Sequence, residues 1–251
     1  MLLSQILNRP KSWILAHGEY ELNPAEIDTI YKNSNKLQKG QPLPYILGQW
    51  DFLGRTFVIT PDVLIPRPET ELLVERAFEI AKTFTHPRIV DVGTGSGVIA
   101  ISLSAELPSA QIIATDLSWA ALRIAKENAY RLGQNLIQFV QSKLLQSFIG
   151  YFDILCANLP YIPTSKLDTL DVAKYEPRLA LDGGVSGLDL IHDLIEQAGP
   201  RMAPRSTLLL EIESSLSLQA LKLTQTFFPE AQIKLHQDLA GLDRLLEIKL
   251  G

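Results

Sequence analysis

The spacing of hydrophobic positions changes near residue 88 and divides the chain into two parts. From Arg88 onward, short apolar runs typical of buried parallel strands alternate with segments whose apolar residues recur at helical spacing. The predicted strands cover residues 89–92, 111–114, 137–140, 152–157, 208–212, 233–235 and 245–248. The predicted helices cover residues 99–107, 118–132, 188–198 and 216–228. This alternation predicts an α/β fold with a doubly wound sheet.

The first part of the chain has a different pattern. A helix is predicted near residues 2–7, and another over 25–37, capped by Asn23-Pro24. Residues 50–53 and 56–59 then flank Gly54-Arg55 and predict a β-hairpin. We therefore expect a helical domain (1–45), a hairpin linker (46–68) and the α/β domain (69–251).

Two prolines mark the junction between the linker and the α/β domain. In Pro66-Arg67-Pro68-Glu69-Thr70, neither proline fits a helix interior, but Pro68 fits a first helical turn. The apolar residues from Leu72 to Ala81 predict that a helix follows. Arg67 is either a solvated side chain or the partner of an anion or carboxylate, and the spacing does not separate the two.

Composition narrows the class of protein. The 251 residues are 46% hydrophobic and 20% charged, as in soluble globular proteins, and the net charge is −5 without a run of Lys and Arg. We therefore expect no extended nucleic-acid surface. The single cysteine, Cys156, suits a reducing cytoplasm, and no cysteine or histidine spacing indicates a metal site. No segment is predicted to span a membrane, and no signal peptide is visible.

A glycine-rich loop follows the first strand of the α/β domain. Gly93-Thr94-Gly95-Ser96-Gly97 is spaced G-x-G-x-G, whereas the dinucleotide fingerprint is G-x-G-x-x-G. Asp116 ends the next strand, where an acid can accept hydrogen bonds from ribose hydroxyls. The pattern suits a nucleoside without phosphates, such as S-adenosylmethionine. Its amino group could be met by Asp91 or by a neighbouring carbonyl.

Asn158-Leu159-Pro160-Tyr161 follows the apolar strand 152–157, so it is expected to face the ligand. Methyl transfer to a planar nitrogen needs that weak nucleophile to be held and aimed at the methyl group. The side-chain oxygen of Asn158 and the backbone carbonyl of Leu159 could accept its two N–H groups. Tyr161 offers a flat face for packing. We expect a single in-line displacement, after which the proton leaves to water.

These motifs resemble those of the glutamine methyltransferases that modify class I peptide-chain release factors. The resemblance rests on residues 65–71, 91–97, 158–161, 176–184 and 238–244 and covers almost the whole chain. It implies a Rossmann-like class I methyltransferase sheet, mostly parallel with an antiparallel last strand, and an N-terminal helical domain that helps hold the release factor. The substrate would be the glutamine of the Gly-Gly-Gln loop, and S-adenosylhomocysteine would be a product.

The resemblance also assigns site residues. The cofactor would contact Gly93, Thr94, Gly95, Ser96, Gly97, Asp116, Leu144 and Asn158, and the glutamine amide would contact Asn158, Leu159, Pro160 and Tyr161.

The sequence departs from the family pattern in three places. Leu159 replaces the first proline of an Asn-Pro-Pro-Tyr motif, a change that keeps the backbone carbonyl. Lys143-Leu144 occupies the position where the family often has an acidic residue followed by an aromatic residue beside the adenine. The N-terminus looks short for the family.

Four other functions compete with release-factor methylation. They are methylation of a ribosomal-protein glutamine, methylation of the adenine amine in DNA or RNA, a nicotinamide-dependent oxidoreductase and a non-catalytic binding module. The net negative charge disfavours a nucleic-acid substrate, and the spacing of the glycines disfavours binding of a nicotinamide cofactor.

Overall fold

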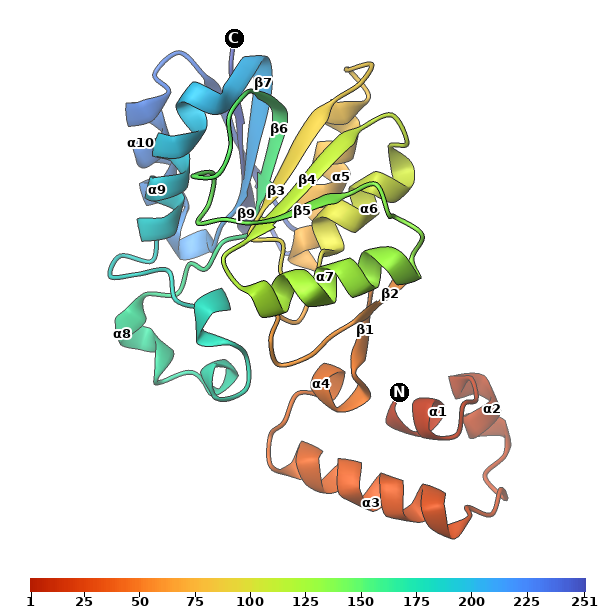
Figure 1. The fold of residues 1–251 in the computed structure, drawn as a ribbon. Helices are drawn as coiled ribbons and strands as arrows, with labels where there is room; N and C mark the ends of the chain where they lie inside the picture. The colour runs from red at the N-terminus through yellow and green to blue at the C-terminus, as the bar shows by residue number, and fades with distance from the viewer.

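The computed structural model describes residues 1–251. Its centre is a seven-stranded sheet in the order β5-β4-β3-β6-β7-β9-β8 (Figure 1). The strands are β3 (Arg88–Val92), β4 (Gln111–Asp116), β5 (Gln138–Gln141), β6 (Phe152–Ala157), β7 (Met202–Glu211), β8 (Gln232–Gln237) and β9 (Asp243–Lys249). Strands β3 to β7 pair in parallel, while β9 runs antiparallel to both of its neighbours. The predicted mostly parallel sheet with an antiparallel last strand is confirmed.

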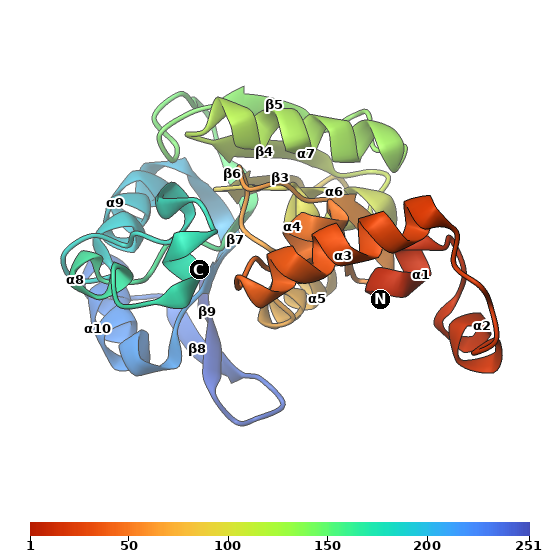
Figure 2. The same cartoon turned by 90° about the horizontal axis from the view of Figure 1, so that it is seen from below.

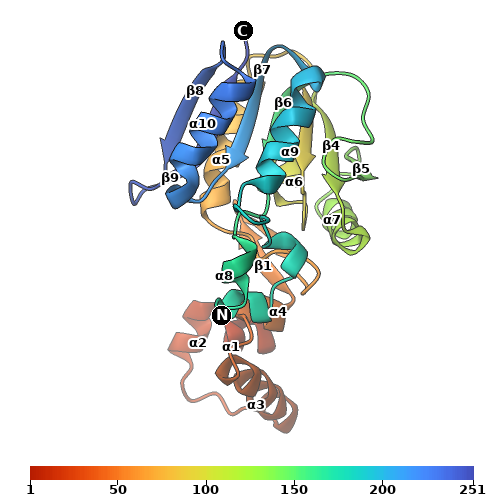
Figure 3. The ribbon, with the colours of Figure 1, turned by 90° about the vertical axis from the view of Figure 1, so that its left-hand side faces the viewer.

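Helices cover both faces of this sheet. One face carries α5 (Glu69–Ala81), α6 (Val98–Glu106) and α7 (Trp119–Arg131), and the other carries α9 (Asp189–Ala198) and α10 (Ser217–Phe227) (Figure 3). Side chains of the central strand β6 alternate between the two cores: Ile154 and Cys156 face α5 and α6, whereas Leu155 and Ala157 face α9 and α10. Burial on both faces explains why this strand is a continuous apolar run.

Four helices form an N-terminal unit that lies apart from the sheet (Figures 1 and 2). They are α1 (Leu2–Ile6), α2 (Lys11–Ala16), α3 (Pro24–Gln38) and α4 (Leu43–Leu47). Helix α3 begins as predicted: Asn23 and Glu26 form a capping box, and Pro24 occupies the first turn. The short helices α2 and α4 were not predicted. No residue of α1, α2 or α3 is buried, so this unit lacks a closed core.

The linker contains the predicted hairpin, β1 (Gln49–Phe52) and β2 (Arg55–Val58). The predicted turn, Gly54-Arg55, is wrong by one residue. The turn residues are Leu53 and Gly54, with φ angles of 45° and 70°, and Arg55 pairs with Phe52. A two-residue type I′ turn requires positive φ at both positions, and its twist matches that of the strands. Phe52 and Phe57 are thereby placed in the core beside α5.

The other differences concern polar or short segments. Strand β7 begins at Met202, six residues before the predicted start, because Met202 already pairs with Phe152 before the register shifts. The segment between β6 and α9 holds the short helix α8 (Thr164–Leu167) and the 3₁₀ turns η1 (Asp171–Lys174) and η2 (Arg178–Ala180). The turns η3 (Gly199–Arg201) and η4 (Ser214–Leu216) precede β7 and α10. None of the helices combines the length and the apolar character that crossing a bilayer would need.

Candidate active site

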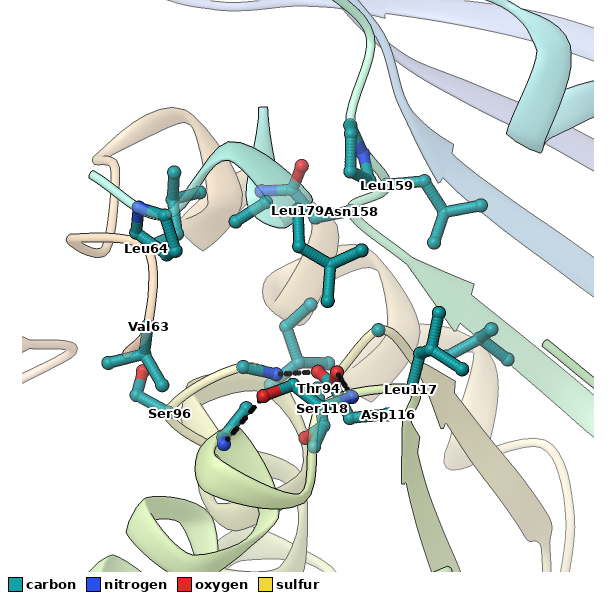
Figure 4. A pocket seen from close by; sticks show the side chains of 18 of the residues that line it. Val63, Leu64, Thr94, Ser96, Asp116, Leu117, Ser118, Asn158, Leu159 and Leu179 are labelled. Atoms are coloured by element: carbon teal, nitrogen blue, oxygen red, sulfur yellow. Dashed lines mark hydrogen bonds between the residues drawn. The ribbon is translucent and has the colours of Figure 1, made fainter. Parts of the chain in front are cut away.

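The main cavity opens at the carboxyl ends of β3, β4 and β6 and encloses about 1150 Å³ of empty space, including its mouth. Residues of the linker and of the segment between β6 and α9 complete its walls. In Figure 4, Asn158 and Leu159 lie on one side of this cavity, while Asp116, Leu117 and Ser118 lie on the other. Ligands of open α/β sheets bind at this end of the strands.

The glycine loop forms one wall. Gly93, Gly95 and Gly97 have φ angles of 77°, 56° and 86°, a backbone region that residues with a Cβ rarely adopt. The first two glycines line the cavity together with Thr94 and Ser96. Gly97, which was expected to contact the cofactor, lies outside the cavity walls, where a Cβ would stand 2.8 Å from Ile101 Cδ1. Its role is to let α6 begin directly behind the loop.

Asp91 lies beneath the loop rather than in the cavity. Its Oδ2 accepts hydrogen bonds from Thr94 Oγ1 (2.6 Å) and from the backbone N–H of Ala100 (3.2 Å), while its buried Oδ1 has no partner. Burial raises the pKa of Asp91 to about 7. This carboxyl group therefore braces the loop, and the expected contact with a ligand amino group does not fit its position.

Asp116, by contrast, lines the cavity at the end of β4. Its Oδ1 accepts from the backbone N–H of Ser118 (2.8 Å) and its Oδ2 from that of Gly95 (2.9 Å). Burial raises its pKa, and the backbone hydrogen bonds oppose that shift. A carboxylate offers about four acceptor positions, so two remain for the hydroxyls of a ribose.

Lys143 and Leu144 also line the cavity. The ammonium group of Lys143 lies 3.2 Å from Asp193 Oδ2, so its charge is paired on the surface. Leu144 is buried and has a φ angle of 53°. This uncommon conformation for leucine places its apolar side chain in the wall where the sequence predicted an adenine contact.

The motif Asn158-Leu159-Pro160-Tyr161 keeps two acceptors free. Asn158 donates from Nδ2 to Thr70 Oγ1 at 3.0 Å, whereas no protein group donates to Asn158 Oδ1 or to the backbone carbonyl of Leu159. Both residues line the cavity. The side chain of Leu159 is buried against the glycine loop. The leucine side chain thus joins the Asn158–Tyr161 motif to the glycine loop.

The motif continues with Pro160, which lines the cavity, and Tyr161, which does not. Burial raises the pKa of Tyr161 to about 12, with the nearby charge of Glu211 adding to the shift. A Cβ at Gly183 would stand 2.7 Å from Tyr161 Cα, and one at Gly187 would stand 2.6 Å from its carbonyl oxygen. These two glycines therefore let the following loop pack directly on the backbone of Tyr161.

An ion pair ties that loop to the linker. Arg67 lies 2.5 Å from Glu176 Oε1, and Glu176 Oε2 accepts from the backbone N–H of Ile65 at 3.1 Å. Of the two readings of Arg67, the structure favours a carboxylate partner. Sequence reasoning singled out both segments but did not connect them, because their separation of 109 residues gives no local signal.

Comparisons with known proteins agree with this geometry. Residues 68–174 match the methyltransferase small domain and residues 1–48 match the PrmC N-terminal domain. A release factor glutamine methyltransferase of Moorella thermoacetica is 40% identical over 95% of this chain and 84% of its own length. One of Bradyrhizobium diazoefficiens is 36% identical over 99% of this chain and 86% of its own.

The chain belongs to the release factor glutamine methyltransferase family. Solved structures of lower identity share its fold. A ribosomal protein L11 methylase of Lactobacillus delbrueckii is 22% identical, with a TM-score of 0.53 over 74% of this chain and 81% of its own. A 16S rRNA methyltransferase of T. thermophilus, solved with AdoMet and guanosine, is 17% identical, with a TM-score of 0.60 over 81% of this chain and 50% of its own.

Proposed function

We propose that this chain transfers a methyl group from S-adenosylmethionine to the side-chain amide nitrogen of the glutamine in the Gly-Gly-Gln motif of class I peptide-chain release factors. The observation that carries the proposal is the pair of free acceptors, Asn158 Oδ1 and the Leu159 carbonyl, on the same cavity as Asp116. The nearly full-length relatives, named release factor glutamine methyltransferases, support the choice of substrate.

The acceptor pair suits a primary amide. An amide nitrogen is a weak nucleophile because its lone pair is delocalised into the carbonyl. Accepting both of its N–H groups fixes the nitrogen in place and favours a pyramidal geometry, in which the lone pair can point at the methyl carbon. The N–C bond then forms as the S–C bond breaks, and the amide proton leaves to water.

The cavity fits the methyl donor. S-adenosylmethionine carries the electrophilic methyl group on a sulfonium. Asp116 would accept from the ribose hydroxyls, Leu144 would pack beside the adenine, and Asn158 would adjoin the methyl group. Gly93, Thr94, Gly95 and Ser96 would let the backbone approach closely. This fit needs no metal.

The domain division follows from the same assignment. We infer that residues 1–45 hold the release factor, that the hairpin linker (46–68) joins this unit to the methyltransferase domain (69–251), and that the protein acts in the cytoplasm. Apolar side chains of the helical unit that remain exposed, among them Leu15 (76%) and Tyr31 (68%), support a role in holding a partner.

The decisive experiment combines the purified protein, labelled S-adenosylmethionine and a release factor, and maps the methylated residue by peptide mass spectrometry. Methylation of the Gly-Gly-Gln glutamine, lost when that glutamine is replaced by alanine, is the expected result. Ribosomal proteins and total RNA serve as competing substrates. Label on either of them, with none on the release factor, would overturn the proposal.

A further inference from the structure

Three side chains from distant parts of the chain meet at the Asn158–Tyr161 motif, and one of them, Thr70, also lines the cavity. They are Thr70 in the first turn of α5, Asn158 just after β6, and Glu211 at the end of β7. Thr70 and Glu211 are almost inaccessible, with exposures of 2% and 3%. Neither has a part in the proposed chemistry, and the sequence offers no reason for an acid directly after the apolar residues 208–210.

A hydrogen bond joins two of the three groups, and the third lies beside them. Asn158 Nδ2 donates to Thr70 Oγ1 at 3.0 Å. The carboxyl group of Glu211 lies beside both side chains, and their polar groups offset part of the effect of burial on its pKa. Its Oε2 is buried without a partner. Glu211 therefore places a hydrogen-bond acceptor at the buried end of this set of three side chains.

The surrounding groups fix the orientation of the Asn158 side-chain amide. Thr70 Oγ1 accepts from Asn158, so its proton is free to point toward Glu211, whose ionised carboxylate can only accept. The amide of Asn158 then has its nitrogen turned inward and its oxygen left for the cavity. The reversed amide would place Oδ1 against the acceptors behind it and leave that oxygen without a donor, a costly arrangement in a buried site.

We propose that Thr70 and Glu211 are positioning residues that fix the amide of Asn158 with its oxygen toward the cavity, so that the site selects substrates that donate hydrogen bonds. This inference rests on the proposed function, because the selected group is the glutamine NH₂. It explains why a threonine follows Pro66-Arg67-Pro68-Glu69, and it implies that a glutamate carboxylate at the same position of the substrate is excluded.

The sharpest variant is Thr70→Val, which keeps the shape of the side chain and removes the hydroxyl. Assayed at about pH 8, where Glu211 with its pKa of about 7 is mostly ionised, the variant should lower kcat on the release factor about tenfold. Calorimetric affinity for S-adenosylmethionine should not change. Thr70→Ser should restore most of kcat. Thr224→Val is the control, since Thr224 is equally buried but its hydroxyl donates to Ala220 within α10.

A double-mutant cycle separates positioning from packing. In an Asn158→Ala background, Thr70→Val should cause no further loss of kcat, because the group that it positions is gone. A full additional tenfold loss there, or unchanged kcat for Thr70→Val alone, would overturn the proposal. Failure of the wild-type protein to methylate any release factor would instead contradict the proposed function.

A measurement that does not depend on turnover tests the positioning role even if no release factor is methylated. The side-chain N–H resonances of Asn158, assigned by their disappearance in Asn158→Ala, should shift in Thr70→Val and return toward their wild-type position in Thr70→Ser. Unchanged resonances in Thr70→Val would overturn the positioning role whatever the enzyme's substrate.

Discussion

Leu159 and Gly93 are in direct contact: a Cβ built on Gly93 would lie 2.9 Å from Leu159 Cδ2. The first residue of the glycine loop and the second residue of the Asn158–Tyr161 motif therefore pack as one unit. The contact is made by the leucine side chain, and it couples the backbone that would bind the cofactor to the carbonyl that would bind the amide.

Gly93→Ala tests this coupling. The new methyl group must displace Leu159, and the φ angle of 77° adds strain of about 1 kcal/mol. We expect affinity for S-adenosylmethionine, measured by calorimetry, to fall at least about tenfold. Gly133→Ala is a matched control, since Gly133 has a φ angle of 73° but open space around its Cβ position. Equal cofactor affinity in the two variants would show that the contact is unimportant.

Asn158→Ala removes one of the two acceptors for the substrate amide. Turnover of the release factor should fall by roughly a hundredfold, a typical loss when one preorganised hydrogen-bonding group is deleted from a reaction centre. Calorimetry should show nearly unchanged affinity for S-adenosylmethionine. Wild-type turnover in this variant would rule out a role for Asn158 in holding the substrate amide.

Glu176→Gln tests the tie between the linker and the loop after β6. Glu176 is buried and paired with Arg67, which is about one-third exposed, so the substitution should lower the free energy of unfolding by about 1–3 kcal/mol. The more exposed pair of Arg55 and Glu106 provides the control, and Glu106→Gln should cost at most about 1 kcal/mol. Urea unfolding measures both. An equal loss in the two variants would contradict a structural tie at Glu176.

The pH dependence of stability tests the buried carboxyl group of Glu211. Burial and the charge of Glu69 raise its pKa from the ordinary value of 4.5 to about 7, while Arg244, Thr70 and Asn158 act in the opposite direction. A raised pKa means that stability is fully present below pH 4.5 and is lost as pH rises through 7.

The free energy of unfolding should therefore decrease between about pH 5 and pH 8, by at most about 3 kcal/mol from this group. Glu211→Gln should flatten part of that decrease. The remainder should persist, because Asp91 is buried and has a similarly raised pKa of about 7. If the free energy of unfolding of Glu211→Gln depended on pH as it does in the wild-type protein, the whole effect would come from other groups.

Sequence reasoning recovered the architecture because its signals are local. The apolar run of Phe152–Ala157 and the helix cap at Asn23 each depend on a few neighbouring residues, and both appear as predicted. The turn of the hairpin was displaced by one residue, since Leu53 adopts a positive φ that sequence preference does not favour.

The sequence indicated residues of the site only where a single segment contains the whole motif. Asp116 and the Asn158 motif were found, but Tyr161 and Gly97 lie outside the cavity walls, because which way a loop residue faces depends on what packs against it. The contacts of Arg67 with Glu176, and of Thr70 with Asn158 and Glu211, join segments more than 50 residues apart. Only the folded chain brings them together.

The single cysteine has a practical consequence. Cys156 is fully buried near the carboxyl end of β6, two residues before Asn158, and burial raises the pKa of its thiol. A thiol reagent can modify it only when the middle of the sheet opens. The unaltered protein thus carries one built-in probe, and its rate of thiol labelling reports how often the strand beneath the substrate motif becomes accessible, and how strongly a bound methyl donor suppresses that opening.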